Sequence, residues 1–413
     1  MDVSFEKLLD GIHSDENRNY RFLHLTPNEP AMSDTARSFL LSPLGDRYYF
    51  GPGENGVKDN GALTSLGLGG VGAIVDAAED ALKRTLGASV INMNCLSGVH
   101  AMMCVLLAVT SPGDTVMTLD HDHGGHFATK GILKQTGRHS IDTIYDFTKQ
   151  QFDAKAIAQR FHENKATLLY LDVSYYTAPI NIRELRDELG EEALIVFDAS
   201  HTLGLLVGGS ITSPLREGAD IICANTHKTL PGPQKGLIAF RDGARGKDAN
   251  SIIDGCLVSS AHTGSLLALS TTILEMERFG EQYAKLVIDN AQALGESLYR
   301  HGFNLRRNPD GSFSRTHQIH VKTDGLGGRR DIYDKLYHNS IAVAFDSPSI
   351  LHNGTFIRLG TQEITRRGMR PEHMNTISQF IKHSIEGENI RFEVEEFKQS
   401  FPSVLFSFDK GDE

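Results

Sequence analysis

The chain has 413 residues, a formal net charge of −11 and 40% hydrophobic residues. The negative charge, with lysines and arginines scattered along the chain, excludes nucleic acid and anionic membrane surfaces as expected partners. Its four cysteines lack a CxxC spacing, its N-terminus is too polar for a secretory signal, and it has no run of about 18 apolar residues, so we expect a cytoplasmic protein with reduced thiols.

Short apolar segments alternate with amphipathic segments through the middle of the chain. The predicted strands are SVINM (89–93), TVMTL (115–119), TLLYLDV (167–173), ALIVFD (193–198), DIICA (220–224) and GLIAF (236–240). The predicted helices between them include HAMMCVLLAV (100–109) and IRELRDELG (182–190). Apolar strands separated by helices imply an α/β fold, with a mostly parallel sheet covered on both faces.

The length and the order of these segments suggest division into domains. We expect an N-terminal arm (1–45), a large domain (46–275) and a smaller C-terminal α+β domain (276–413). A long helical pattern over 265–300 connects the two domains. The segments HQIHV (317–321) and GTFIRLG (354–360) are the predicted strands of the small domain.

Polar residues follow several of the predicted strands. Because ligands of α/β sheets bind at the carboxyl ends of strands, these residues are candidates for one shared crevice. They are Ser97, His123, Ser174, Asp198, His201, Thr226 and Lys228.

The chemistry of these residues suits pyridoxal phosphate. Burial would lower the pKa of Lys228 and make its amine nucleophilic toward an aldehyde. Asp198 could keep a pyridine nitrogen protonated, and the ring of His123 could lie on the pyridine. Ser97 and Gly98 begin a predicted helix, whose free N–H groups favour a phosphate.

Each feature also has a simpler interpretation. Lys228 alone could be an ordinary loop lysine, and Asp198 alone could cap the following helix. HDHGGH (121–126) could bind a metal, but no matching carboxylate or cysteine pattern accompanies it. GLGGVG (67–72) fits a dinucleotide motif but follows no clear strand, and CLSGV (95–99) lacks the GxSxG pattern of a hydrolase nucleophile.

The order of motifs resembles serine hydroxymethyltransferase and its relatives among pyridoxal-phosphate enzymes of fold type I. The resemblance covers about residues 20–385. It is carried by HGGH (123–126), FDASH (197–201), THKTLPGP (226–233) and IRLGTQEITRRG (357–368).

The resemblance implies a role for each matching residue. Lys228 would form the internal aldimine, Asp198 would pair with the pyridine nitrogen and His123 would stack on the ring. The other implied positions are Ser97 and Gly98 at the phosphate, Ser174 near the phenolic oxygen, His201 and Thr226 on the substrate side, Arg358 at the substrate carboxylate, and Tyr48 and Gly264 reaching the site of a neighbouring subunit. A homodimer with shared active sites is the smallest implied assembly, and a tetramer is an alternative.

The chain departs from the folate-using members of the family in the segment YYFGPGENG (48–56). Tyr48 is kept, but Phe50 stands where those enzymes carry a catalytic glutamate, and the segment after it is shortened. Gln234 and Lys235 replace an arginine and a glycine in the lysine motif. A phenylalanine cannot transfer protons, so this pattern argues against folate-dependent serine–glycine exchange.

The sequence thus favours an L-threonine transaldolase that needs no folate and resembles those of natural-product pathways. Retro-aldol cleavage of threonine would release acetaldehyde and leave a glycyl quinonoid, which would add to a second aldehyde and give a β-hydroxy-α-amino acid. Two alternatives stay open, a threonine or β-hydroxy amino acid aldolase and an altered serine hydroxymethyltransferase. Nothing in the sequence identifies the acceptor aldehyde.

Overall fold

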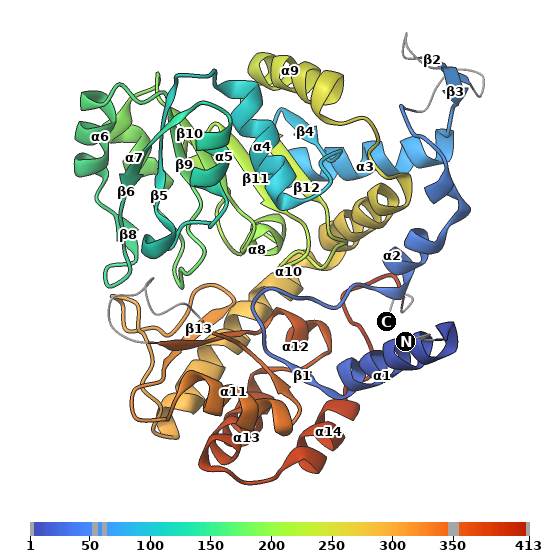
Figure 1. The fold of residues 1–413 in the computed structure, drawn as a ribbon, viewed down its shortest axis with the longest axis vertical. Coiled ribbons are helices and arrows are strands. Elements are labelled where there is room, and N and C mark those ends of the chain that lie inside the picture. Colours follow the sequence, from blue (N-terminus) through green and yellow to red (C-terminus); the bar gives the residue numbers. More distant parts are fainter. Residues whose placement is uncertain (1–3, 52–56, 60–63, 346–354, 410–413) are drawn as a thin grey trace.

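The computed structural model describes residues 4–51, 57–59, 64–345 and 355–409. A large domain surrounds a seven-stranded sheet, and a smaller domain lies at the far end of the long helix α10 (Thr263–Arg300) (Figure 1). Among the described residues, no helix is both long and apolar enough to span a membrane.

The large-domain sheet confirms the predicted α/β class. In spatial order its strands are β4 (Val90–Asn92), β12 (Gly236–Phe240), β11 (Ile221–Asn225), β10 (Leu194–Asp198), β9 (Leu168–Leu171), β5 (Thr115–Leu119) and β6 (His139–Thr143). All neighbouring pairs from β11 to β6 are parallel, whereas β12 runs antiparallel to both of its neighbours. The sequence predicted all of these strands except β6, an edge strand whose residues are mostly polar.

Helices pack on both faces of this sheet. They are α3 (Gly69–Leu86), α4 (Gly98–Val109), α5 (Thr129–Gln135), α6 (Ala154–Glu163), α7 (Ile182–Leu189), α8 (Leu203–Val207) and α9 (Gly243–Ile252). Successive strand residues point to opposite faces. On β11, Ile221 joins the core beneath α4, and Ile222 joins the core shared with α3, α8 and α10. Buried strand residues on both faces explain the continuous apolar runs in the sequence.

Four short strands add two small sheets to the large domain. They are β2 (Val57–Asp59), β3 (Thr64–Leu66), β7 (Tyr145–Asp146) and β8 (Gln151–Phe152). Of these, β2 pairs with β3 and β7 pairs with β8, each as an antiparallel two-stranded sheet.

The small domain contains an antiparallel three-stranded sheet packed against helices. Its strands are β13 (Gln318–Lys322), β16 (Phe356–Gly360) and β15 (Ala344–Phe345), and its helices are α11 (Arg329–His338), α12 (Gln362–Arg366), α13 (Met374–Glu386) and α14 (Arg391–Gln399). The predicted strands of this domain correspond to β13 and β16.

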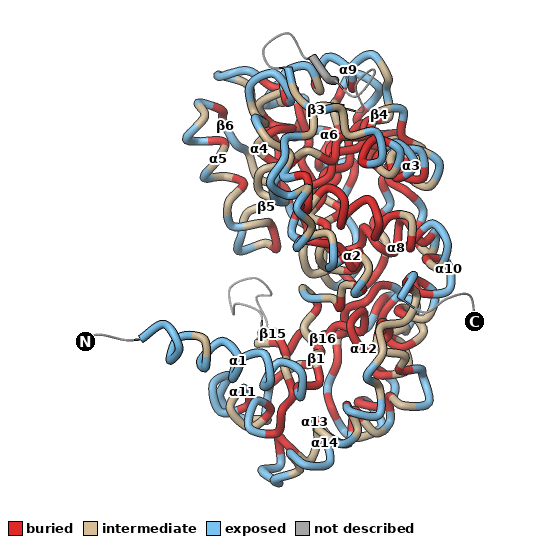
Figure 2. Tube along the Cα trace, turned by 90° about the vertical axis from the view of Figure 1, so that its right-hand side faces the viewer, coloured by how far each residue is buried: buried red, intermediate tan, exposed pale blue. Residues whose placement is uncertain are grey.

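The part of the N-terminal segment around β1 (Leu23–His24) belongs structurally to the small domain. This strand pairs with β14 (Ile341–Ala342), and Leu25 lies in the small-domain core. The helix α1 (Phe5–Arg21) has no buried residue and extends from the body of the chain (Figure 2), whereas α2 (Asp34–Ser38) packs beside α10.

The helix α10 contributes residues first to the large-domain core and then to the small-domain core. Val287 is still part of the large-domain core, and Ala291, one turn later, belongs to the small-domain core. The switch from one core to the other lies after the predicted domain boundary at 275/276. The helix is continuous there, so its local sequence carries no signal of a boundary. The helix therefore sets the position of the small-domain sheet relative to the large domain.

Candidate active site

A cavity of about 180 Å³ lies at the carboxyl ends of β9, β10 and β11, beside the N-terminus of α4. It brings together five of the predicted residues at strand ends together with Gly98. The lining consists of Ser97, Gly98, Val99, Met102, His126, Asp172, Val173, Ser174, Asp198, Ser200, His201, Asn225, His227 and Lys228. The cavity therefore lies at the carboxyl ends of the strands, and five of the seven residues expected in one crevice line it.

One end of the cavity is formed by the beginning of α4. The Ser97 hydroxyl caps this helix by accepting a hydrogen bond from the His100 N–H at 3.1 Å. A Cβ atom on Gly98 would come within 2.7 Å of Asn225 Cβ, so only glycine allows the helix to approach β11 this closely. The first N–H groups of a helix attract anions, and this end suits a phosphate.

Asp198 ends β10 and is held from three sides. Its Oδ1 accepts a hydrogen bond from the Ser200 N–H at 2.9 Å, and its Oδ2 accepts one from the Tyr170 hydroxyl at 3.3 Å. The Cys223 thiol lies 3.9 Å from Oδ2. These contacts fix a carboxylate in the cavity wall, where it could bind a protonated ring nitrogen.

Lys228 and His201 form the chemical centre of the cavity. Lys228 Nζ lies 2.9 Å from His201 Nε2. Burial lowers the pKa of Lys228, the carboxylate of Asp198 opposes this effect and the positive charge of Arg358 adds to it, which together give a pKa of about 8. Burial, with the charge of Lys228, also lowers the pKa of His201 well below its ordinary range, so the imidazole is neutral.

The lowered pKa predicts the pH dependence of Lys228 acylation in the protein without cofactor. Only the free amine reacts, so the rate should be low below the pKa and rise through a midpoint near pH 8, instead of near the ordinary value of 10.5. Acetic anhydride labelling with peptide mass mapping measures this midpoint, with the exposed Lys149 as internal reference. A midpoint above about 10 would contradict the assigned environment.

The second histidine of the HGGH motif, His126, lines the cavity, whereas His123 is absent from the described lining. His123 ends a short 3-10 turn, and Gly124 with φ 94° redirects the chain. The His126 N–H then donates to the Asp172 carboxylate at 3.0 Å, and burial lowers the pKa of the His126 ring. A neutral ring in the wall is suited to stack on a pyridine, so the structure favours His126 for the role predicted for His123.

Ser174 lies in the cavity wall as predicted, but Thr226 does not face the cavity. The Thr226 hydroxyl donates to Pro233 O at 2.6 Å and accepts from the Lys235 N–H at 3.1 Å. These bonds close the loop that carries Lys228. Thr226 therefore shapes the lysine loop from inside.

Arg358 approaches the site from the small domain. It lies on β16, is 7% exposed and stacks on Tyr175, with its guanidinium carbon 4.7 Å from the ring centroid. Its charge contributes to the lowered pKa values of both Lys228 and His201. A cation held between the domains near the reactive amine suits a substrate carboxylate.

Tyr48 and Gly264 lie near each other, and neither lines the cavity of its own chain in the described residues. The Thr263 hydroxyl donates to Arg47 O at 2.5 Å, and a Cβ atom on Gly264 would meet Phe39 O at 2.9 Å. Tyr48 is 55% exposed, so its ring lies at the surface of the single chain.

Phe50 stacks on Tyr48, with ring centroids 5.6 Å apart and an angle of 15° between the planes. Residues 52–56 of the predicted folate-related segment lie outside the described residues. Phe50 thus places an apolar ring beside Tyr48.

The cavity also fits a polar cofactor because its wall contains buried polar atoms that lack a bond. Asn225 Oδ1 and His227 Nδ1 have no hydrogen-bond partner among the described residues. Buried polar atoms of this kind are costly unless a ligand or water satisfies them. Together with the helix N-terminus, the carboxylate and the low-pKa lysine, they match the groups of pyridoxal phosphate.

The sequence identified neither His126, Asn225 nor His227 as a site residue. The paired histidines of HGGH were a usable signal for His126, but the choice between them depends on the turn at Gly124. Asn225 and His227 lie on either side of Thr226 in the lysine motif, so their neighbourhood was visible although their orientation was not.

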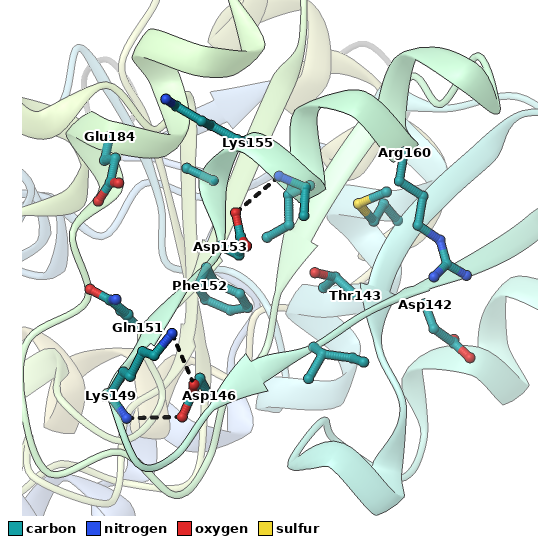
Figure 3. Close-up of a pocket in the computed structure, with 15 residues that line it drawn as sticks. Asp142, Thr143, Asp146, Lys149, Gln151, Phe152, Asp153, Lys155, Arg160 and Glu184 are labelled. Carbon is teal, nitrogen blue, oxygen red and sulfur yellow. Dashed lines mark hydrogen bonds and ion pairs between the residues drawn. The ribbon is translucent and has the colours of Figure 1, made fainter.

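A more open cavity of about 450 Å³ lies elsewhere on the large domain, beside β6, β8 and α6 (Figure 3). Charged groups of both signs surround it, among them Asp142, Lys149 and Arg160. Its lining includes none of the predicted site residues. The smaller cavity around Lys228 is therefore the candidate active site.

The family model of serine hydroxymethyltransferase matches residues 2–381. The chain belongs to this family. It is therefore a pyridoxal-phosphate enzyme with the fold type I architecture that the motifs indicated. The serine hydroxymethyltransferase of Methanocella arvoryzae is 32% identical over 419 residues, which cover 97% of this chain and 96% of the relative.

Transaldolases are also among the similar proteins. The fluorothreonine transaldolase of Streptantibioticus cattleyicolor is 37% identical over 412 residues, which cover 96% of this chain but 63% of the relative. This chain thus spans less than two thirds of that protein. The crystal structure of L-threonine transaldolase from Pseudomonas fluorescens in its internal aldimine state has a TM-score of 0.89 and 29% identity, and the match covers 98% of this chain and 93% of that one.

Proposed function

We propose that this enzyme is a folate-independent L-threonine transaldolase. It would cleave the Cα–Cβ bond of threonine, release acetaldehyde and join the remaining glycine unit to a second aldehyde. The product would be a β-hydroxy-α-amino acid. The similarity to two transaldolases supports this reaction, and the similarity to serine hydroxymethyltransferases makes folate-dependent serine–glycine exchange the competing one.

The observation that carries the proposal is Phe50. This residue stands where the folate-using enzymes have a catalytic glutamate, and its stack on Tyr48 puts an apolar ring at that position. Without the carboxylate, the site loses a proton donor and acceptor for one-carbon transfer. In a site shared between two chains, this apolar ring would also make the wall drier, slow protonation of the glycine Cα and give an aldehyde time to react.

Each residue of the cavity has a separate role in the proposed reaction. When bound, pyridoxal phosphate supplies the electron-accepting ring that makes bonds at the amino acid Cα labile. We assign the phosphate to the N-terminus of α4, the pyridine nitrogen to Asp198, the ring face to His126 and the covalent attachment to Lys228. Arg358 would bind the threonine carboxylate and so orient the Cα–Cβ bond for cleavage.

His201 and Lys228 are the groups placed to move protons. Both have lowered pKa values, so near pH 8 the His201 ring is neutral and a substantial share of Lys228 is the free amine. Retro-aldol cleavage requires removal of the proton from the β-hydroxyl, and a neutral base near the reacting carbon can accept it.

The reaction can be tested by incubating the enzyme with L-threonine and a panel of aldehydes. We expect acetaldehyde release together with new β-hydroxy-α-amino acids, detected by mass spectrometry. Tetrahydrofolate should change neither product. Robust tetrahydrofolate-dependent conversion of serine to glycine would replace this proposal with an altered hydroxymethyltransferase, and acetaldehyde with free glycine as the only products would indicate an aldolase.

We further propose that two chains complete each active site. The exposed position of Tyr48 beside Gly264, away from the cavity of its own chain, supports this arrangement. Inactive Lys228→Ala chains mixed with inactive Tyr48→Ala chains should regain activity through hybrid dimers, up to about a quarter of the wild-type value per site for random pairing with one intact site per hybrid. Verified hybrids without activity would contradict shared sites.

A further inference from the structure

A chain of hydrogen bonds leads from the small domain to Lys228, through side chains of β13. Arg306 Nη1 lies 3.4 Å from His320 Nδ1, His320 Nε2 lies 3.3 Å from Gln318 Oε1, and Gln318 Nε2 lies 3.3 Å from His201 Nδ1. Both β13 residues, Gln318 and His320, are 0% exposed. We call this series the β13 relay, and its last member, His201, contacts Lys228 at 2.9 Å.

The direction of each bond in the β13 relay follows from donor and acceptor chemistry. Arginine only donates, so His320 Nδ1 accepts and the ring carries its hydrogen on Nε2. That hydrogen is directed to Gln318 Oε1. Gln318 Nε2 also donates to Ser174 O at 3.0 Å, and because a carbonyl oxygen only accepts, this contact fixes which end of the Gln318 amide is the nitrogen.

The amide of Gln318 in turn fixes the tautomer of His201. One amide hydrogen goes to Ser174 O, and the second faces His201 Nδ1, which must therefore accept. The neutral His201 ring has one hydrogen left, on Nε2, and this hydrogen points to Lys228 Nζ. Only an amine with a free lone pair accepts such a bond, so this arrangement requires Lys228 to be unprotonated.

We propose that Gln318 is a positioning residue that, through His201, holds Lys228 as the free amine able to attack the aldehyde of the cofactor. A protonated Lys228 would need His201 Nε2 as an acceptor. The hydrogen of the neutral ring would then be on Nδ1, where it would face the amide hydrogen of Gln318 with no acceptor between them. Glutamine is suited to this place because it accepts from His320 and donates to His201 at the same time. The inference rests on the proposed role of Lys228 as the cofactor lysine.

Other charged groups face the pair but do not select the tautomer. Asp198 on β10 favours the charged form of Lys228, and Arg358 on β16 disfavours it. Arg358, His317 on β13 and His126 all disfavour a charged His201. These groups act on the total charge, whereas the Gln318 amide distinguishes between the two nitrogens of a neutral ring.

The test uses the protein without cofactor, so that it does not depend on the reaction. Long-range ¹H–¹⁵N correlation spectra of protein with ¹⁵N-labelled histidine report the tautomer of each ring, and the signal missing from His201→Gln identifies His201. At a pH well above the Lys228 midpoint near 8, where the amine is free, we expect hydrogen on Nε2 in the wild type and on Nδ1 in Gln318→Glu, whose carboxylate can only accept. Hydrogen on Nδ1 in the wild type at that pH would overturn the proposal, even if every Gln318 variant failed to fold.

The pH midpoint of Lys228 acylation provides a second readout. It should rise by about one unit in Gln318→Met, which loses the donor and adds no charge, and further in Gln318→Glu. Gln362→Met is the matched control, because Gln362 is also a buried glutamine of the small domain but donates to Thr26 O and Glu29 O. Folded Gln318 variants whose midpoint equals that of the control would contradict the proposal.

Failure of this proposal and failure of the proposed function give different results. If His201 in the cofactor-free protein carried its hydrogen on Nδ1, the role of Gln318 would be rejected. The assay with threonine and aldehydes would still test the proposed reaction. Conversely, tetrahydrofolate-dependent exchange would change the reaction but would not alter the histidine spectra. Each proposal can therefore be rejected without the other.

Discussion

Replacing Lys228 with alanine should abolish covalent attachment of pyridoxal phosphate and lower turnover by roughly 10³-fold or more. The reason is that the described cavity lining contains no second amine that could replace the Lys228 side chain. The phosphate end of the cavity and Asp198 would remain, so the variant should still bind the cofactor without a covalent bond. Borohydride reduction followed by peptide mapping distinguishes the two modes of binding.

Lys235 offers a matched control for the Lys228 variant. It is a lysine of the same loop, it is 1% exposed, and burial lowers its pKa to about 8 as well. Its Nζ donates to Ala261 O at 2.8 Å, outside the cavity lining. Lys235→Met should therefore still carry the reduced label on Lys228. If the reduced cofactor were found on another lysine of the wild-type protein and not on Lys228, the assignment of Lys228 as the cofactor lysine would be wrong.

The strands of the large domain could be predicted because each is an apolar run bounded by polar residues. β10 and β11 were placed to within one residue at each end. Of the residues expected at the cavity from these two strand ends, Asp198, His201 and Lys228 line it, whereas Thr226 does not. The edge strand β6 was missed, since HSIDT is mostly polar and lies partly exposed. Local hydrophobicity identifies a strand buried on both faces more readily than a strand at an edge.

The parts of the site that depend on tertiary structure could not be derived from the strand ends. His126 replaces His123 in the lining because a positive-φ glycine turns the chain between them. Gln318 and His320 belong to the small domain, and Gln318 contacts His201 across the junction between the domains, while His320 contacts Gln318. Their spacing of two along a strand puts both on one face, but nothing in the sequence indicates what that face meets.

The junction between the domains is also tied by a fully buried ion pair that local patterns do not reveal. Arg366 of α12 and Glu275 of α10 are each 0% exposed in their side chains, with Nη2 and Oε2 2.9 Å apart. The Arg366 guanidinium also donates to Ala31 O and to Phe406 O, and Glu275 Oε1 accepts from the Phe408 N–H at 3.1 Å. One pair thereby connects both chain ends with the long helix.

Arg366→Met should lower the free energy of unfolding by about 3 to 5 kcal/mol, because it leaves the Glu275 carboxylate buried without its countercharge. Urea unfolding of the cofactor-free protein measures the change. Lys285→Met, which breaks an exposed pair with Asp289, should cost less than about 1 kcal/mol and serves as the control.

The double variant Arg366→Met with Glu275→Leu separates the two contributions to this loss. Removing both charges should restore part of the stability, since the buried carboxylate no longer needs a partner, while the lost hydrogen bonds to Ala31, Phe406 and Phe408 remain a cost. If the double variant were less stable than Arg366→Met, the hydrogen bonds to the backbone, and not the pairing of charges, would be the main contribution of this pair to stability. A single variant no less stable than the Lys285 control would show that the ion pair does not hold the junction, and another contact of α10 would then have to keep β13 beside His201.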